Sequence, residues 1–123
     1  MSPDKEELLV SKYPSLYTQY TWPSSLTAMC WGFSHGDGWF DIIDKLSAKL
    51  EPLGIQAAQV KEKFGTLRFY PDHITPENRD AVMTAILEAE EKSAITCEIC
   101  GNPGKKTGGR WIKTLCDSCY SKQ

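Results

Sequence analysis

The sequence predicts an α+β domain, in which helices pack on a small antiparallel β-hairpin or sheet, followed by a short cysteine-rich unit at the C-terminus. Three observations predict this class. Apolar residues recur every three or four positions at 39–50 and 81–93, as on the buried face of a helix. Between these segments, residues 57–70 alternate with a period of two, as strands with one buried face do. Two pairs of cysteines lie within the last 27 residues.

Helix signals mark three segments before the cysteines. Pro3, followed by acidic residues, predicts a helix to about Tyr13, because proline and negative charge both favour a first helical turn. A second helix is expected at 39–50, with Asp37 as its N-terminal cap. A third is expected to begin at Thr75 and Pro76, to end near residue 93, and to pack across the sheet.

The strands are expected at 57–70, either as a hairpin that turns near Gly65 or as one strand that is kinked there. Val60 and Glu62 fall on one face before the turn, and Leu67 and Phe69 alternate with polar neighbours after it. We therefore expect a short antiparallel hairpin that is covered by the two longer helices.

The composition is that of an ordinary globular domain, with 41% hydrophobic and 24% charged residues among 123. We divide the chain into an α+β core at 1–95 and a C-terminal lobe at 96–123. A membrane span requires about 20 consecutive apolar residues, and no segment approaches that length. The acidic N-terminus lacks the basic and apolar regions of a secretory signal. These features predict a cytoplasmic protein with no membrane partner.

The two cysteine pairs carry the clearest chemical signal. Cys97, Cys100, Cys116 and Cys119 follow the pattern C-x2-C-x15-C-x2-C, in which both spacings are those of zinc sites. Metal binding is favoured over disulfides in a cytoplasm that keeps thiols reduced. Because four thiolates complete a tetrahedron and leave no position open for water, we expect one structural Zn²⁺.

Around these ligands the sequence predicts a treble-clef-like zinc finger. Its expected parts are a knuckle at the first pair, a return strand at 110–115 anchored by Trp111, and a terminal helix at 116–121. The run WIKTLCDSC at 111–119 resembles the corresponding stretch of GATA-type fingers. This resemblance is confined to the last 27 residues.

A catalytic site at Cys30, His35 and Asp37 is an alternative, because a thiol, an imidazole and a carboxylate are the groups of a cysteine nucleophile. We prefer a structural interpretation, since catalytic partners usually come from distant parts of a chain. It expects a packed Cys30, a solvent-facing His35 and a capping Asp37. A second metal at His35, Asp37 and His73 has no supporting spacing. We therefore predict that the protein is not an enzyme.

Aromatic side chains are concentrated at Trp31, Phe33, Trp39 and Phe40, among small glycines. Such a cluster either packs in the core or shapes a cleft in which a planar ligand, such as a small nucleotide, stacks. Core packing is favoured, because aromatic residues dominate the burial of small domains.

Basic residues suggest a second surface. Lys61, Lys63 and Arg68 can share one face of the hairpin, and further cations in the lobe extend it to a basic strip, namely Lys105, Lys106, Arg110 and Lys113. The alternative is an ordinary solvated surface with interleaved acids. Residues 1–96 carry nine Lys or Arg and fourteen Asp or Glu, whereas residues 97–123 carry five and two.

Three runs occur in order along the chain: CWGF with GDGW at 30–39, VKEKFGTLRFY at 60–70, and the cysteine pairs. Together they resemble a family of small bacteriophage and prophage proteins, over the chain from about residue 29 onward. The resemblance implies an accessory protein in the cytoplasm of a bacterial host cell and supplies no catalytic residue. On this basis we expect stoichiometric binding of a host protein, which inhibits a host or antiviral-defence factor. The alternatives are a nucleic-acid-binding zinc finger and, third, a nucleotide-binding protein or enzyme that uses Cys30 and His35.

Overall fold

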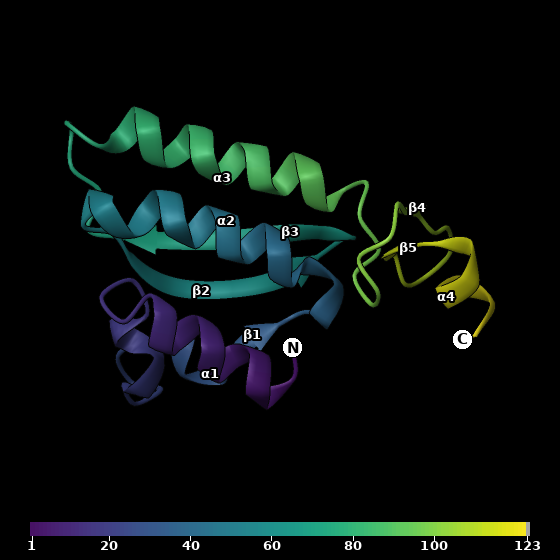
Figure 1. Ribbon diagram of the computed structural model, residues 1–123, viewed down its shortest axis with the longest axis horizontal. Coiled ribbons are helices and arrows are strands. Elements are labelled where there is room, and N and C mark those ends of the chain that lie inside the picture. The colour runs from purple at the N-terminus through teal and green to yellow at the C-terminus, as the bar shows by residue number, and fades with distance from the viewer. Residues whose placement is uncertain (123) are drawn as a thin grey trace.

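The computed structural model describes residues 1–122 and confirms an α+β fold with a cysteine-rich lobe at its C-terminus (Figure 1). The core contains three α-helices and three strands, which are α1 (Pro3–Lys12), β1 (Phe33–Ser34), α2 (Phe40–Leu50), β2 (Gln56–Lys63), β3 (Thr66–Asp72) and α3 (Arg79–Ser93). Short 3-10 helices connect these elements, namely η1 (Thr18–Thr21), η2 (Met29–Trp31), η3 (Asp37–Trp39) and η4 (Glu51–Leu53). The lobe adds β4 (Lys105–Lys106), β5 (Thr114–Leu115) and α4 (Asp117–Ser121). No helix within residues 1–122 is long and apolar enough to cross a membrane.

The core sheet has the order β1-β2-β3 and is mixed. Strands β2 and β3 form the expected antiparallel hairpin, and both of its turn residues, Phe64 and Gly65, have positive φ angles of 53° and 84°. Two positive φ angles are typical of the tight turns that match the twist of a hairpin. Strand β1 was not expected; it pairs in parallel with β2, with Phe33 opposite Val60.

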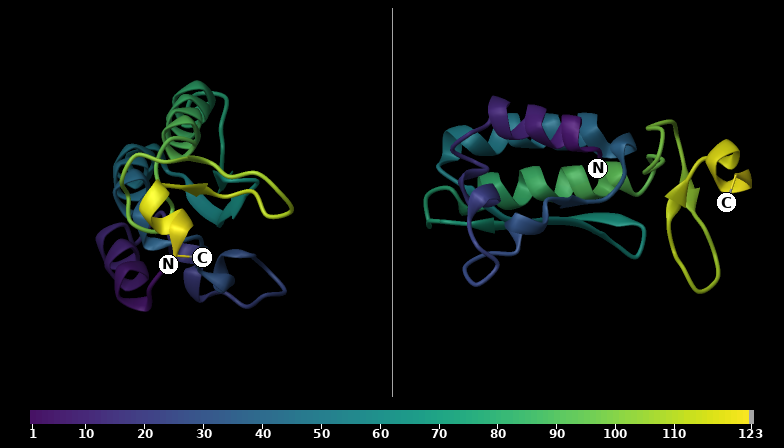
Figure 2. Two further views of the ribbon diagram at one scale, coloured as in Figure 1. Left: turned by 90° about the vertical axis from the view of Figure 1, so that its right-hand side faces the viewer. Right: turned by 90° about the horizontal axis from the view of Figure 1, so that it is seen from below.

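One face of the hairpin is covered by α2 and α3, and α1 lies beside α2 (Figures 1 and 2). Val60 pairs with Phe69, and both side chains are buried under the helices together with Leu67. Because side chains alternate along a strand, the opposite face carries the other set. We call this set the open face: Gln59, Lys61, Lys63, Thr66, Arg68 and Tyr70.

Two helix starts differ from those expected. Asp37 does not cap α2, because its carboxylate accepts a hydrogen bond from the amide of Ser2 at 2.7 Å. Helix α3 begins at Arg79 rather than at residue 75. The side chains and amides of Thr75 and Asn78 bond each other reciprocally, which closes a turn before the helix.

The C-terminal lobe sits at the end of the sheet where the β2-β3 turn lies, and it is joined to the end of α3 (Figure 1). The return strand is shorter than expected. Only Thr114 and Leu115 pair with β4, and Trp111 is 76% exposed in the preceding loop, so the prediction that Trp111 anchors the lobe is wrong.

Candidate metal centre

The four cysteines predicted as ligands are brought together in the lobe. Their sulfurs all lie within 4.8 Å of one another, and the sulfurs of Cys100 and Cys116 are 3.6 Å apart. Sulfurs placed about 2.3 Å from one ion at the corners of a tetrahedron would be about 3.8 Å apart. Cys97 and Cys119 are buried, whereas Cys100 is exposed at the rim. The set fits one tetrahedral ion and fills its coordination sphere.

The local electrostatics also favour a cation at this point. Burial opposes ionisation of Cys97, but the amides of Cys100, Cys116 and Ile99 donate to its sulfur and lower its pKa to about 6. The hydrogen bond with the thiol of Cys116, together with burial, raises the pKa of Cys119 to about 12. Four neighbouring thiols cannot all become thiolates without a compensating charge. A divalent ion supplies that charge and deprotonates its ligands.

The backbone around the cysteines forms two short knuckles. In the first, the amide of Gly101 donates to the carbonyl of Cys97 at 3.0 Å, and the amide of Cys97 donates to the carbonyl of Asn102 at 2.7 Å. In the second, Cys116 caps α4 and its sulfur accepts from the amide of Cys119 at 3.4 Å. The two-residue spacing within each pair therefore places both sulfurs on one side of a turn. Knuckle, β4-β5 hairpin and terminal helix follow in the expected order.

The first knuckle packs against the GDGW run of the core, residues 36–39. The amide of Gly38 donates to the carbonyl of Glu98 at 2.7 Å, and the indole of Trp39 donates to the carbonyl of Thr96 at 2.9 Å. A Cβ on Gly38 would lie 2.1 Å from the carbonyl oxygen of Cys97, and one on Gly36 would lie 2.4 Å from that of Glu98. Side chains at these two positions would prevent the contact, so glycine is required by the closeness of the two backbones.

The VKEKFGTLRFY run holds the other side of the lobe. Lys113 reaches Glu62 of β2 at 2.8 Å and Glu98 of the first knuckle at 3.6 Å, and all three side chains are largely buried. The hydroxyl of Thr114 donates to the carbonyl of Gly65 at 2.5 Å. The GDGW run, the VKEKFGTLRFY run and the segment with the cysteine pairs therefore contact one another in the fold. Glu62 occupies a core-facing position of β2, where the other side chains on this face are apolar. A carboxylate among apolar residues is the feature of the sequence that could have indicated this buried ion pair.

The Cys30, His35 and Asp37 side chains each have a different partner. The thiol of Cys30 donates to the carbonyl of Thr27, and Asp37 binds the Ser2 amide. His35 is buried against Trp39 and hydrogen-bonds the carbonyl of Gly36, so the prediction that it faces solvent is wrong. None of the hydrogen bonds within residues 1–122 joins two of these three groups. The cysteine cluster is also the only set in this range that could hold a metal ion, so His35, Asp37 and His73 do not form one.

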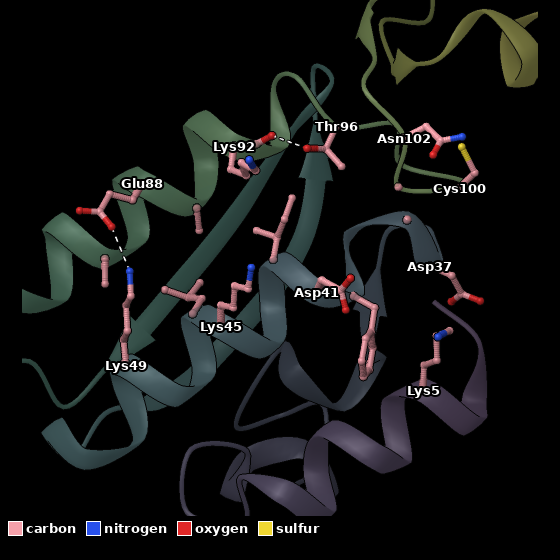
Figure 3. Close-up of a pocket in the computed structure, with 17 residues that line it drawn as sticks. Lys5, Asp37, Asp41, Lys45, Lys49, Glu88, Lys92, Thr96, Cys100 and Asn102 are labelled. Carbon is pink, nitrogen blue, oxygen red and sulfur yellow. Dashed lines mark hydrogen bonds and ion pairs between the residues drawn. The ribbon is translucent and has the colours of Figure 1, made fainter.

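The aromatic cluster does not act as one unit. Phe33 and Trp39 are buried in the core, as the packing interpretation expects, whereas Trp31 is 71% exposed. Phe40 is half-buried and lines a groove of about 630 Å³ between α2, α3 and the first knuckle (Figure 3). Its rim carries charges of both signs, and Lys49 pairs with Glu88 across it at 3.0 Å. This mixture presents no convergent set of groups for a ligand.

Some of the predicted basic residues form ion pairs within the described part of the chain, and the others do not. Lys113 is held by its ion pairs and does not offer a free charge. Lys105 lies 4.0 Å from Asp117, with both side chains strongly exposed. The others have no carboxylate within 4.0 Å in residues 1–122, namely Lys61, Lys63, Arg68, Lys106 and Arg110. The loop between β4 and β5 projects toward the side of the sheet that the helices leave uncovered (Figure 2), so this set borders one surface.

Comparisons with protein-family models, with curated proteins and with solved structures find no match.

Proposed function

We propose that this protein is a non-enzymatic binding protein, in which a structural Zn²⁺ fixes the lobe and a partner binds to the uncovered side of the sheet. We call that side the binding surface. It combines the open face, the hairpin tip at Phe64, and residues 105–112 of the lobe. A single observation carries the proposal: exposed aromatic side chains lie there beside exposed or half-buried basic side chains that have no carboxylate within 4.0 Å in residues 1–122.

Zinc is the ion that the donor set favours. Four cysteine sulfurs in a tetrahedral arrangement suit Zn²⁺, whereas Mg²⁺ and Ca²⁺ prefer oxygen ligands. With all four positions filled, the ion has no site for a reacting water. Its role is to replace an apolar core, because only Cys97, Leu115 and Cys119 form the buried cluster of the lobe.

The binding surface is shaped by contacts that depend on the lobe. The hairpin tip touches the lobe, since a Cβ on Gly65 would lie 3.5 Å from a methyl carbon of Ile112 and 3.2 Å from the hydroxyl of Thr114. Phe64 is 62% exposed beside this contact, and Trp111 is 76% exposed beyond it. Large apolar side chains exposed near unpaired cations are typical of sites that are covered in a complex.

The resemblance to phage and prophage proteins supplies the setting for this proposal, the cytoplasm of a bacterial host cell. An accessory protein without a catalytic site acts there by occupying its target in stoichiometric amounts. In this proposal, a host or defence component is blocked because the binding surface covers it or withdraws the macromolecule on which it works.

The test is capture from host lysate by the immobilised, zinc-loaded protein, with both protein and nucleic acid quantified. The surface variant combines Trp111→Ser with Arg68→Ser. The control variant combines Leu87→Ser with Lys45→Ser, which removes one exposed apolar and one basic side chain from the helical side. We expect the wild type and the control to retain a macromolecule at near one equivalent, and the surface variant to lose it. Equal retention by both variants, or none by the wild type, would refute the proposal.

A further inference from the structure

We infer, building on the proposed function, that the partner is a single-stranded nucleic acid, whose phosphates contact the basic side chains of the binding surface and whose bases stack on its aromatic side chains. Two independent features of the surface support this inference, namely its charge and the kind of apolar group that it exposes.

The charge is divided unevenly along the chain. Residues 56–72 and 105–113 carry seven Lys or Arg and two Asp or Glu, a net charge of +5, whereas the remainder carries −7. Glu62 forms an ion pair with Lys113, and the carboxylate of Asp72 accepts a hydrogen bond from the side-chain amide of Gln19 at 3.0 Å. The acidic side chains of these segments are therefore engaged, and the five free cations complement a polyanion.

The cations of the open face are close to one another. Lys61 and Arg68 lie directly opposite on the paired strands β2 and β3, and Lys63 follows two residues along on the same face. Like charges held side by side are unfavourable without a counter-charge. The Nε atom of Arg68 is buried and has no hydrogen-bond partner, so part of its guanidinium is already desolvated. An array of phosphates would neutralise this group.

Three aromatic rings are exposed at intervals along this side, and Ile112 is the exposed aliphatic neighbour in the lobe loop. Tyr70 lies on the open face two residues beyond Arg68 and is 42% exposed, Phe64 stands at the hairpin tip, and Trp111 lies in the lobe loop. Lys63 approaches the ring of Phe64 at 5.7 Å. Aromatic rings interleaved with cations are the arrangement on which the bases of single strands stack without regard to sequence.

A duplex fits this surface less well. Its bases are stacked on one another and reachable only through grooves, which a protruding helix or ribbon enters. The lobe helix α4 has five residues, and it lies away from the loop that carries Trp111 (Figure 2). An open sheet with exposed rings instead requires bases that are already unstacked.

The test is fluorescence anisotropy with labelled oligothymidylate and oligouridylate of about 15 nucleotides, beside a mixed-sequence duplex of equal length. The two single strands show whether DNA or RNA is preferred. Contacts to five phosphates predict a slope of about −3.5 for the logarithm of affinity against that of salt concentration, or about 100-fold weakening from about 50 to 200 mM. Single strands are expected to bind more tightly than the duplex.

Matched variants connect the binding to the surface. Trp111→Ser and Tyr70→Ser are each expected to weaken single-strand binding about tenfold, whereas Tyr120→Ser on α4 leaves it within about twofold. Lys61→Gln with Arg68→Gln reduces the salt slope by about 1.4, and Lys45→Gln with Lys92→Gln on the helical side leaves the slope unchanged. Full zinc content shows that the lobe of each variant is folded, and an unchanged urea midpoint shows that its core is folded.

Three results would overturn the inference: no binding of either single strand at low salt, equal or tighter binding of the duplex, or surface variants that bind as the wild type does. If the single strands fail to bind while capture from lysate still depends on the binding surface, the partner is a protein. In that case the inference falls and the proposed function stands. If capture is also independent of the surface, both fall.

Discussion

Substitution of Gly38 by alanine tests how the lobe is held to the core. The new Cβ would lie 2.1 Å from the carbonyl oxygen of Cys97 and 2.7 Å from that of Glu98. Contacts below 3.0 Å essentially do not occur for real Cβ atoms, and the obstacle here is backbone. The knuckle must therefore move away from the GDGW run.

Three hydrogen bonds are lost when the knuckle moves. They are the bonds from the Gly38 amide to the Glu98 carbonyl, from the Gly36 amide to the Glu98 carboxylate and from the Trp39 indole to the Thr96 carbonyl. At about 1 kcal/mol for each bond between neutral groups and about 2 kcal/mol for the carboxylate, the free energy of unfolding falls by about 4 kcal/mol.

Urea denaturation of the reduced, zinc-loaded protein at neutral pH measures this loss. With a dependence of about 2 kcal/mol per molar urea, the midpoint of Gly38→Ala is expected to fall by about 2 M. Gly108→Ala is the matched control, because its Cβ meets nothing within 4 Å, and its midpoint is expected to stay unchanged. If Gly38→Ala unfolded at the same urea concentration as Gly108→Ala, the docking argument would be wrong.

Three further predictions concern the metal, the buried histidine and the ion pair. Cys116→Ser is expected to lose stoichiometric zinc in elemental analysis, while Cys30→Ser retains one ion per chain; zinc retained by both would contradict the ligand assignment. Burial lowers the pKa of His35 to about 4, so the stability due to its neutral form is complete above about pH 6.5 and decreases by about 3 kcal/mol toward pH 4. Unfolding titrations should show that His35→Gln flattens this decrease, and an unchanged pH profile would count against it. Lys113→Met leaves two carboxylates buried without a counter-charge and is expected to lower the unfolding free energy by about 3–5 kcal/mol. Lys106→Met should change it by less than about 0.5 kcal/mol, and equal midpoints for the two lysine variants would show that the ion pair does not contribute.

Local patterns predicted most of the core. The apolar periodicity at 39–50 and the alternation at 57–70 were sufficient for α2 and the β2-β3 hairpin, because each reflects one buried face of one element. Strand β1 could not be predicted in this way. It has two residues, and its pairing with Val60 depends on a parallel contact between distant parts of the chain.

The ligand set was predictable because metal geometry imposes a spacing on the sequence. The docking of the lobe was not, since it depends on how closely Gly38 approaches the knuckle, and a glycine carries no sign of what lies above it. The same holds for Lys113, which looks like any surface lysine until the fold places Glu62 and Glu98 around it. Trp111 was expected to be the apolar anchor of the return strand, and its exposure became apparent only from the fold.

The central claim is that Cys97, Cys100, Cys116 and Cys119 bind one Zn²⁺ that orders the lobe. X-ray absorption at the zinc edge, with elemental analysis of the reduced protein, tests it most directly. We predict one zinc per chain with four sulfur neighbours at about 2.3 Å and no lighter ligand. A protein that is folded throughout the lobe without bound metal, or a zinc with nitrogen or oxygen neighbours, would contradict the claim.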